Sequence, residues 1–204
     1  MFKTTKQNSF IHKKVKIFKN YINNDPATIL FSKKIIYIGN SIDYFSYEII
    51  VSQILHFKLF RFKQDLNLFL NFSNDFNDNF EEMHTINLYC LLNIANMQIS
   101  TVNLGLLKGI FSLLLLSASQ RKRFGCYNSQ IILHPYGKTI GMNQNSNELE
   151  KIWKYRSFSN NYLFLQYFMK TKLNIIQTYN LTDRNIFLNS KDSLNFGIID
   201  KIII

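Results

Sequence analysis

The sequence feature that most constrains the fold is the segment Ile99–Arg123, which joins a β-forming stretch to an apolar run through two glycines. Its first six residues are β-formers, and Gly105 and Gly109 predict a tight turn. Residues 110–119 then predict a buried helix, whose dipole would suit the three cations at 121–123. The segment therefore predicts a strand, a glycine turn and a helix in direct succession.

A strand that leads into a helix through a glycine turn is where several hydrolases hold a nucleophile, because the turn exposes a hydroxyl beside helix N–H groups. The middle of this turn reads Lys108-Gly109-Ile110 and holds no hydroxyl or thiol. The simplest interpretation is a core strand and helix of an α/β domain, since a fold alone does not give a function. The apolar run is too short to span a bilayer, which needs about 20 apolar residues.

Length and composition predict one globular domain and do not indicate a nucleic-acid, membrane, metal or cofactor partner. The chain has 204 residues and a formal charge of +11, and that charge would permit binding to nucleic acid or to an anionic membrane. The lysines are spread along the chain, however, and Asn, Ile, Lys and Phe are abundant together, as in an AT-rich genome, so we predict neither partner. Cys90 and Cys126 have no metal-ligand spacing and are predicted to be buried thiols. We predict no cofactor and no metal.

The first 24 residues are basic and contain no acidic residue. Such a segment resembles the tail of an organelle transit peptide, and a solvated basic arm or an axial terminal loop is an equal alternative. Asp25-Pro26 is a predicted boundary, because a residue before proline avoids the α region. We therefore divide the chain into a basic N-terminal segment, residues 1–29, and one domain, residues 30–204.

The rest of the chain alternates predicted strands and helices. Strands are predicted over residues 34–39, 66–71 and 129–133, and helices over residues 41–59, 84–96, 147–172 and 192–196. This order predicts right-handed crossovers and a parallel sheet covered by helices.

The predicted helix 147–172 carries more apolar side chains than a helix that faces solvent, among them Trp153, Leu163 and Phe164. Some of this surface must contact another subunit or element. We expect Leu163 to lie in a contact between subunits.

Several short motifs resemble, in their order along the chain, the proteolytic subunit of the Clp protease, the ClpP family. The motifs are Lys33-Lys34-Ile35-Ile36-Tyr37-Ile38-Gly39, Val51-Ser52-Gln53-Ile54-Leu55, Asp65 to Asn71, Lys122-Arg123-Phe124, Asn128 to Pro135, Asp183 to Leu188 and Phe196 to Lys201. The resemblance covers roughly residues 30–204. It implies an α/β fold of the ClpP/crotonase type, a spiral of ββα units, in which helix 147–172 matches the protruding handle.

The family is a Ser-His-Asp peptidase, and the resemblance assigns its three catalytic positions. The family's Gly-Gln-Ala-Ala-Ser-Met-Gly run reads Gly105 to Phe111 here, which puts Gly109 at the nucleophile position. The histidine falls on His134 and the aspartate on Asn185. A glycine cannot attack a carbonyl, and an asparagine cannot stabilise an imidazolium as an aspartate does. The resemblance therefore implies a degenerate triad and no catalytic residue.

The family's Ser-Pro-Gly-Gly loop, which donates oxyanion-hole N–H groups, should follow Asn71. Residues 72–76 stand there without a glycine, and an acidic side chain in that loop would repel a developing oxyanion. Ser112, three residues after Gly109 and inside the predicted helix, is expected to point elsewhere. His134 is interpreted as a structural remnant, and the role of Lys108 is left open.

The resemblance implies a ring subunit that is not itself a peptidase, of the ClpR type. Family members build stacked heptameric rings, so the implied partners are ClpP subunits and a Hsp100-type AAA+ unfoldase. The basic N-terminal segment and the composition indicate a plastid of the apicoplast type. Two alternatives stay open: a residual serine peptidase that uses Ser112 or a residue from another subunit, and an acyl-CoA enzyme of the crotonase type.

Overall fold

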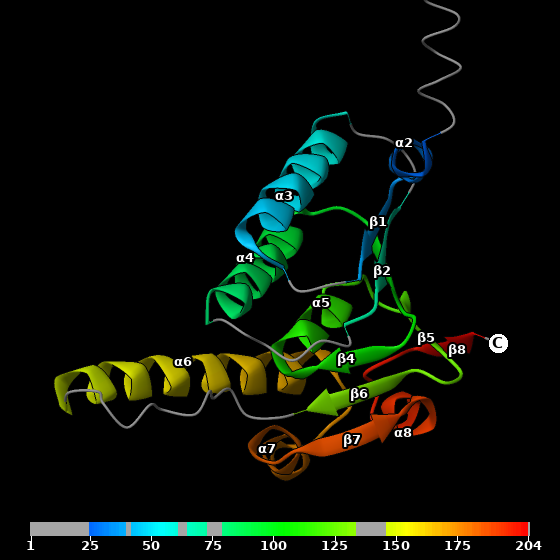
Figure 1. Ribbon diagram of the computed structural model, residues 1–204. Coiled ribbons are helices and arrows are strands. Elements are labelled where there is room, and N and C mark those ends of the chain that lie inside the picture. The colour runs from blue at the N-terminus through cyan, green and yellow to red at the C-terminus, as the bar shows by residue number, and fades with distance from the viewer. Residues whose placement is uncertain (1–24, 40–41, 61–64, 73–78, 134–145, 204) are drawn as a thin grey trace, which may run out of the picture.

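The computed structural model of the chain describes residues 25–39, 42–60, 65–72, 79–133 and 146–203 (Figure 1). The helices are α2 (Pro26–Ser32), α3 (Tyr44–Leu59), α4 (Asn79–Ala95), the 3-10 helix η1 (Gly109–Phe111), α5 (Ser112–Leu116), α6 (Ser146–Lys170), α7 (Ile175–Asp183) and α8 (Ser190–Asn195). The strands are β1 (Ile35–Ile38), β2 (Leu66–Leu70), β3 (Ile99–Asn103), β4 (Leu106–Lys108), β5 (Arg123–Cys126), β6 (Gln130–Leu133), β7 (Ile186–Asn189) and β8 (Lys201–Ile203).

The strands form two sheets, and in Figure 1 β1 and β2 of the first stand upright whereas β4 and β6 of the second lie across the view. A five-stranded sheet has the order β1-β2-β3-β5-β8, and all its neighbouring strands are parallel. A three-stranded sheet has the order β4-β6-β7, with β4 and β6 parallel and β6 and β7 antiparallel. The predicted α/β class with a parallel sheet is therefore confirmed.

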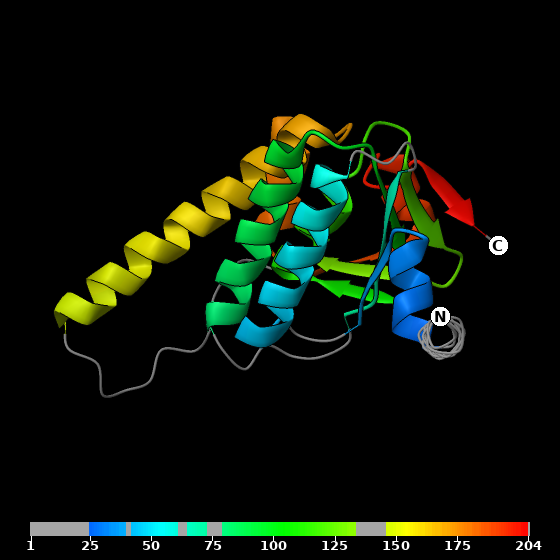
Figure 2. The same cartoon turned by 90° about the horizontal axis from the view of Figure 1, so that it is seen from above.

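Burial explains why these segments form strands. In β2 the leucines at 66, 68 and 70 are buried and alternate with half-buried neighbours, as one buried face of a pleated strand requires. All five residues of β3 are buried, because this strand lies between β2 and β5 at the centre of the sheet. Helices α3 and α4 run side by side over one side of the domain (Figure 2). Asp43 caps the N-terminus of α3, because its side chain accepts a hydrogen bond from the amide of Ser46 at 2.8 Å.

The segment after β3 differs from the prediction. A short strand, β4, precedes the helix and belongs to the second sheet, and the helix ends at Leu116 rather than at residue 119. Two of the three cations that follow contact other parts of the chain. Lys122 forms an ion pair with Asp65 at 2.6 Å, and Arg123 begins β5. Strand β5 and helix α7 were not predicted at all.

Arg123 joins three distant parts of the chain. Its Nε and Nη2 atoms donate to the carboxylate of Asp200 at 3.0 and 2.7 Å, and its Nη1 donates to the carbonyl of Lys170 at 2.8 Å. Burial raises the pKa of the Asp200 carboxyl, but the hydrogen bonds and charge of Arg123 outweigh it, so this pKa lies below its usual value. Lys122 and Arg123, predicted to suit a helix end, therefore make tertiary contacts instead.

Helix α6 confirms the predicted long helix, and it has two unlike halves. Its tip, residues 146–158, projects from the body of the domain, and its root, residues 159–170, packs against it and contains the buried Ser159 and Tyr167 (Figure 2). Leu163 is only 3% exposed and belongs to the subunit's own core, so its expected place in a contact between subunits was wrong. The exposed large apolar side chains of this helix are Trp153, Phe158, Leu165, Phe168 and Met169. No helix among the described residues is long and apolar enough to cross a membrane.

Candidate active site

The turn after β4 is built as a strand-to-helix turn. Strand β4 ends at Lys108, and the next residue, Gly109, is buried, has a φ of 49° and starts η1. A positive φ favours glycine, because a Cβ would be crowded there. Leu107 and Ile110 on either side are buried in the core and hold the turn in place. The geometry is that of a turn that can expose a nucleophile, and the residue at its centre has no side chain.

The strand register brings the predicted site positions to one end of the three-stranded sheet. Lys108 of β4 pairs with Ile132 of β6, and Leu133 of β6 pairs with Ile186 of β7. Since β4 and β6 are parallel and β7 is antiparallel to them, the end of β4, the end of β6 and the start of β7 coincide (Figure 1).

Gly109 directly follows β4, and Asn185, which is exposed, directly precedes β7. These two positions therefore lie on either side of the end of β6. His134 follows β6 in the sequence and lies outside the described residues, as does the loop segment 73–78.

Ser112 is the hydroxyl residue of this turn, and its hydroxyl is fully engaged. Its Oγ donates to the carbonyl of Gly109 at 2.5 Å and accepts from the hydroxyl of Tyr167 at 2.5 Å, and both side chains are fully buried. The side chain thus turns back onto the backbone, as expected for a serine inside the helix. Burial raises the pKa of the Tyr167 phenol, so the phenol stays protonated and remains a donor.

Two aromatic rings pack directly beside the turn. Phe72 follows Asn71, where the oxyanion loop was expected, and Phe111 stands at the last position of the glycine-rich run. Their rings stack with centroids 4.0 Å apart and planes 13° apart, and both side chains are buried. The sequence analysis missed this pair. A signal was present, because the family motifs have small residues at both positions and this chain has phenylalanine at both.

The structure also places Lys108 and the two cysteines. Lys108 is half-buried on β4. The thiols of Cys90 and Cys126 are free and half-buried rather than buried, and Cys90 Sγ lies 3.4 Å from the hydroxyl of Tyr162. Within the part of the chain that the structure describes, no group of three or more His, Cys, Asp or Glu side chains could hold a metal ion.

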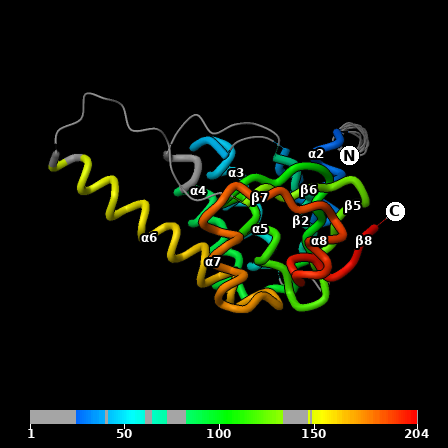
Figure 3. Tube along the Cα trace, turned by 90° about the horizontal axis from the view of Figure 1, so that it is seen from below, coloured from blue at the N-terminus to red at the C-terminus, as the bar shows by residue number. Residues whose placement is uncertain are grey.

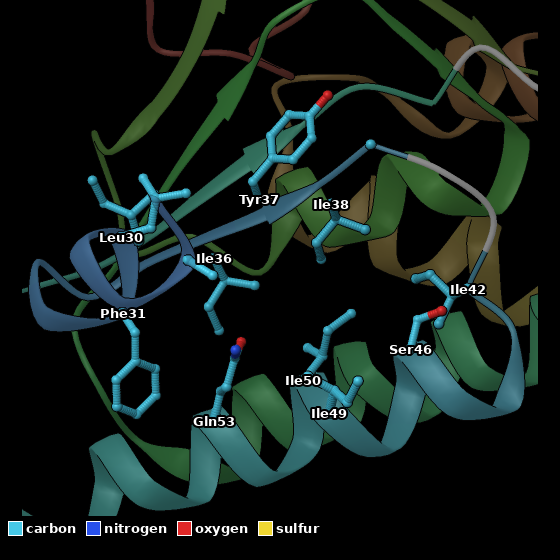
Figure 4. A pocket seen from close by; sticks show the side chains of 13 residues that line it. Leu30, Phe31, Ile36, Tyr37, Ile38, Ile42, Ser46, Ile49, Ile50 and Gln53 are labelled. Atoms are coloured by element: carbon cyan, nitrogen blue, oxygen red, sulfur yellow. The ribbon is translucent and has the colours of Figure 1, made fainter. Parts of the chain in front are cut away.

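An apolar groove of about 550 Å³ lies elsewhere, between α2, β1 and α3 (Figure 4). Leu30 and Phe31 of α2, Ile36 of β1, and Ile50 and Gln53 of α3 line it. None of its lining residues belongs to the turn at Gly109, so this groove and the candidate site are separate.

Comparison with known proteins decides the family. The family model for Clp protease matches residues 19–204. The chain belongs to the Clp protease family. A relative in this family is the ATP-dependent Clp protease proteolytic subunit 3, chloroplastic, of Arabidopsis thaliana. It is 26% identical over 180 residues, which are 88% of this chain and 56% of the relative.

A second relative, the chloroplastic proteolytic subunit 4 of the same plant, is 25% identical over 181 residues, which are 88% of this chain and 59% of the relative. The chain thus spans less than two thirds of the length of these two relatives. The crystal structure of a peptidase from Plasmodium falciparum has the same fold, with a TM-score of 0.72 and 22% identity. The likeness covers 87% of this chain and 99% of that structure.

The stacked pair beside the turn gives a stability prediction for this Clp family member. We expect Phe111→Ala to lower the free energy of unfolding by about 3–5 kcal/mol, because it removes a buried ring and leaves a cavity against Phe72. Phe45→Ala, which truncates a side chain that is 72% exposed on α3, is the matched control and should cost far less. Chemical denaturation of the three proteins measures the difference. An equal loss of unfolding free energy in the two variants would show that the Phe72–Phe111 stack does not contribute to stability.

Proposed function

We propose that this chain is a catalytically inactive subunit of a Clp protease complex. The single observation that carries the proposal is the turn at Gly109, which has the conformation of a nucleophile turn but no side chain at its centre. The hydroxyl three residues further on, at Ser112, donates to a backbone carbonyl and is buried against Tyr167. That engagement argues against a residual peptidase that uses Ser112.

The chemistry of the remaining positions supports the same proposal. Peptide hydrolysis by a Ser-His-Asp triad needs a nucleophile, a base and a carboxylate that stabilises the charged base. Gly109 supplies no nucleophile, and Asn185 is neutral, so it offers hydrogen bonding without charge. Members of a triad act as a unit, so losing two of them leaves nothing for the third to assist. In this proposal His134 is a remnant without a catalytic role.

Assembly is the second part of the proposal. The tip of α6 exposes Trp153 and Phe158, which are 68% and 67% exposed, on a helix that projects from the domain (Figure 2). An exposed apolar surface of this kind favours a contact with another subunit. We infer that the helix packs against neighbouring Clp subunits in a heptameric double ring, and that a Hsp100-type AAA+ unfoldase serves the ring. Family membership supports this arrangement.

We also propose a plastid location of the apicoplast type. The names of two relatives contain the word chloroplastic, and the first 24 residues are basic and without acid. In this proposal residues 1–29 form a leader or an axial loop, and residues 30–204 form the Clp subunit domain.

The proposal predicts that restoring the nucleophile does not restore the enzyme. Neither the wild-type chain nor Gly109→Ser should cleave a short fluorogenic peptide, because Asn185 and the loop after Asn71 remain unsuitable for catalysis. The serine would also adopt the positive φ of 49°, which side chains disfavour. A thermal melt of the variant establishes that it is folded. Peptide turnover by the folded variant above the wild-type background would refute the claim that the defects compound.

The assembly proposal predicts an effect of charge at the tip of α6. Trp153→Asp should reduce the mass of the assembled complex, because it places a charge in an apolar contact between subunits. Lys151→Asp, at an exposed polar position two residues earlier on the same helix, is the control and should keep the mass. Size-exclusion chromatography with light scattering measures both. A Trp153→Asp complex of unchanged mass would show that the tip does not hold subunits together.

A further inference from the structure

The root of α6 is held to the domain by polar contacts from three other elements. Tyr89 of α4 donates to Oε1 of Gln166 at 2.7 Å, and Arg123 of β5 donates to the carbonyl of Lys170. The third contact runs from Tyr167 to Ser112 of α5, and it differs from the others because it continues to the turn. Figure 3 shows α6 passing from its projecting tip to a root that lies beside α7 under the domain.

Hydrogen-bond chemistry fixes the direction of this third contact. The carbonyl of Gly109 can only accept, so Ser112 must donate to it, and Ser112 must then accept from the protonated phenol of Tyr167. We call this chain of groups the Tyr167 relay. The carbonyl of Gly109 also accepts from the backbone amide of Ser112, so the relay ends on the hydrogen bond that closes the turn.

The relay is buried, and that makes it an all-or-none contact. Tyr167 and Ser112 have no exposed surface, so water cannot replace either partner if they separate. A buried hydroxyl without a partner is unfavourable, and hydrogen bonds in a low-dielectric interior reinforce one another. Helix α6 has 25 residues and is therefore about 37 Å long at the usual rise per residue. A small rotation of the helix at its root therefore moves its tip by a large distance.

We propose that the Tyr167 relay couples the position of α6 to the conformation of the turn at Gly109, so that the former nucleophile turn now anchors the projecting helix. This inference goes beyond catalytic inactivity, because it gives the altered site a mechanical role within the subunit. It concerns contacts inside one chain. It can therefore be tested on the purified full-length protein, whatever its activity.

Two backbone amides report on the two ends of the relay. The amide of Ser112 donates to the carbonyl of Gly109 and reports on the turn. The amide of Thr171 donates to the carbonyl of Tyr167 at 3.0 Å and reports on the root of α6. Hydrogen exchange measured by NMR gives the opening of each bond separately.

Tyr167→Phe removes the phenol and keeps the ring. It should accelerate exchange at both reporters, by about five- to tenfold, as expected for the loss of one hydrogen bond. Tyr89→Phe is the matched control, because it removes the phenol of another fully buried side chain, which donates to the neighbouring residue Gln166 rather than to Ser112. It should accelerate the Thr171 amide and leave the Ser112 amide unchanged.

Ser112→Ala breaks the relay from its other end without altering α6. Because a coupling between two sites is reciprocal, this variant should accelerate exchange of the Thr171 amide. An unchanged Thr171 amide in Ser112→Ala, or an unchanged Ser112 amide in Tyr167→Phe, would overturn the proposal. Acceleration of all core amides by the same factor would also overturn the proposal. The contact would then stabilise the whole domain and would not couple α6 to the turn in particular.

Discussion

The buried side chain of Asn103 holds the connection between the two sheets, and the rest of the structure depends on this contact. The chain leaves the five-stranded sheet at Asn103 and enters the three-stranded sheet at Leu106. The Oδ1 of Asn103 accepts from the amide of Gly105 at 3.2 Å, and its Nδ2 donates to the carbonyl of Gln130 at 3.3 Å. One amide group therefore bonds to both the start of β4 and the start of β6. Because β4 is only three residues long, this contact sets where Gly109 and the turn lie.

Large side chains pack around the turn at Gly109. Two positions that are small in the family motif hold Phe72 and Phe111, whose rings stack beside Gly109. Ser112 binds the turn to Tyr167 of the long helix. None of these contacts needs a nucleophile, and Phe72 and Phe111 belong to the leucine-rich core of the domain. In the proposed inactive subunit the fold does not depend on a triad, because apolar burial stabilises it.

The sequence predicted the elements whose pattern is local and missed those defined by distant partners. Strand β2 and helix α3 were predicted within three residues, because alternation and helical spacing can be read directly from the sequence. Strand β5 was missed because Arg123, which begins it, finds its partner Asp200 far along the chain. Leu163 was misplaced because helical spacing identifies an apolar face without telling whether that face meets its own subunit or another one.

The same limit applies to the candidate site. The resemblance located Gly109 and Asn185, which the strand register then brings to one end of the second sheet. The Phe72–Phe111 stack and the contact between Tyr167 and Ser112 join segments that are distant in sequence. No local pattern marks such pairs, so they required the three-dimensional structure.

Reconstitution with a disabled partner tests the central claim most directly. A complex is assembled from this chain, an active Clp subunit whose nucleophilic serine has been replaced by alanine, the unfoldase and ATP, and degradation of a folded substrate is measured. The account predicts no degradation by this complex, and degradation when the active subunit keeps its serine. Degradation by the complex with the disabled partner would contradict the account, because this chain would then supply a nucleophile of its own.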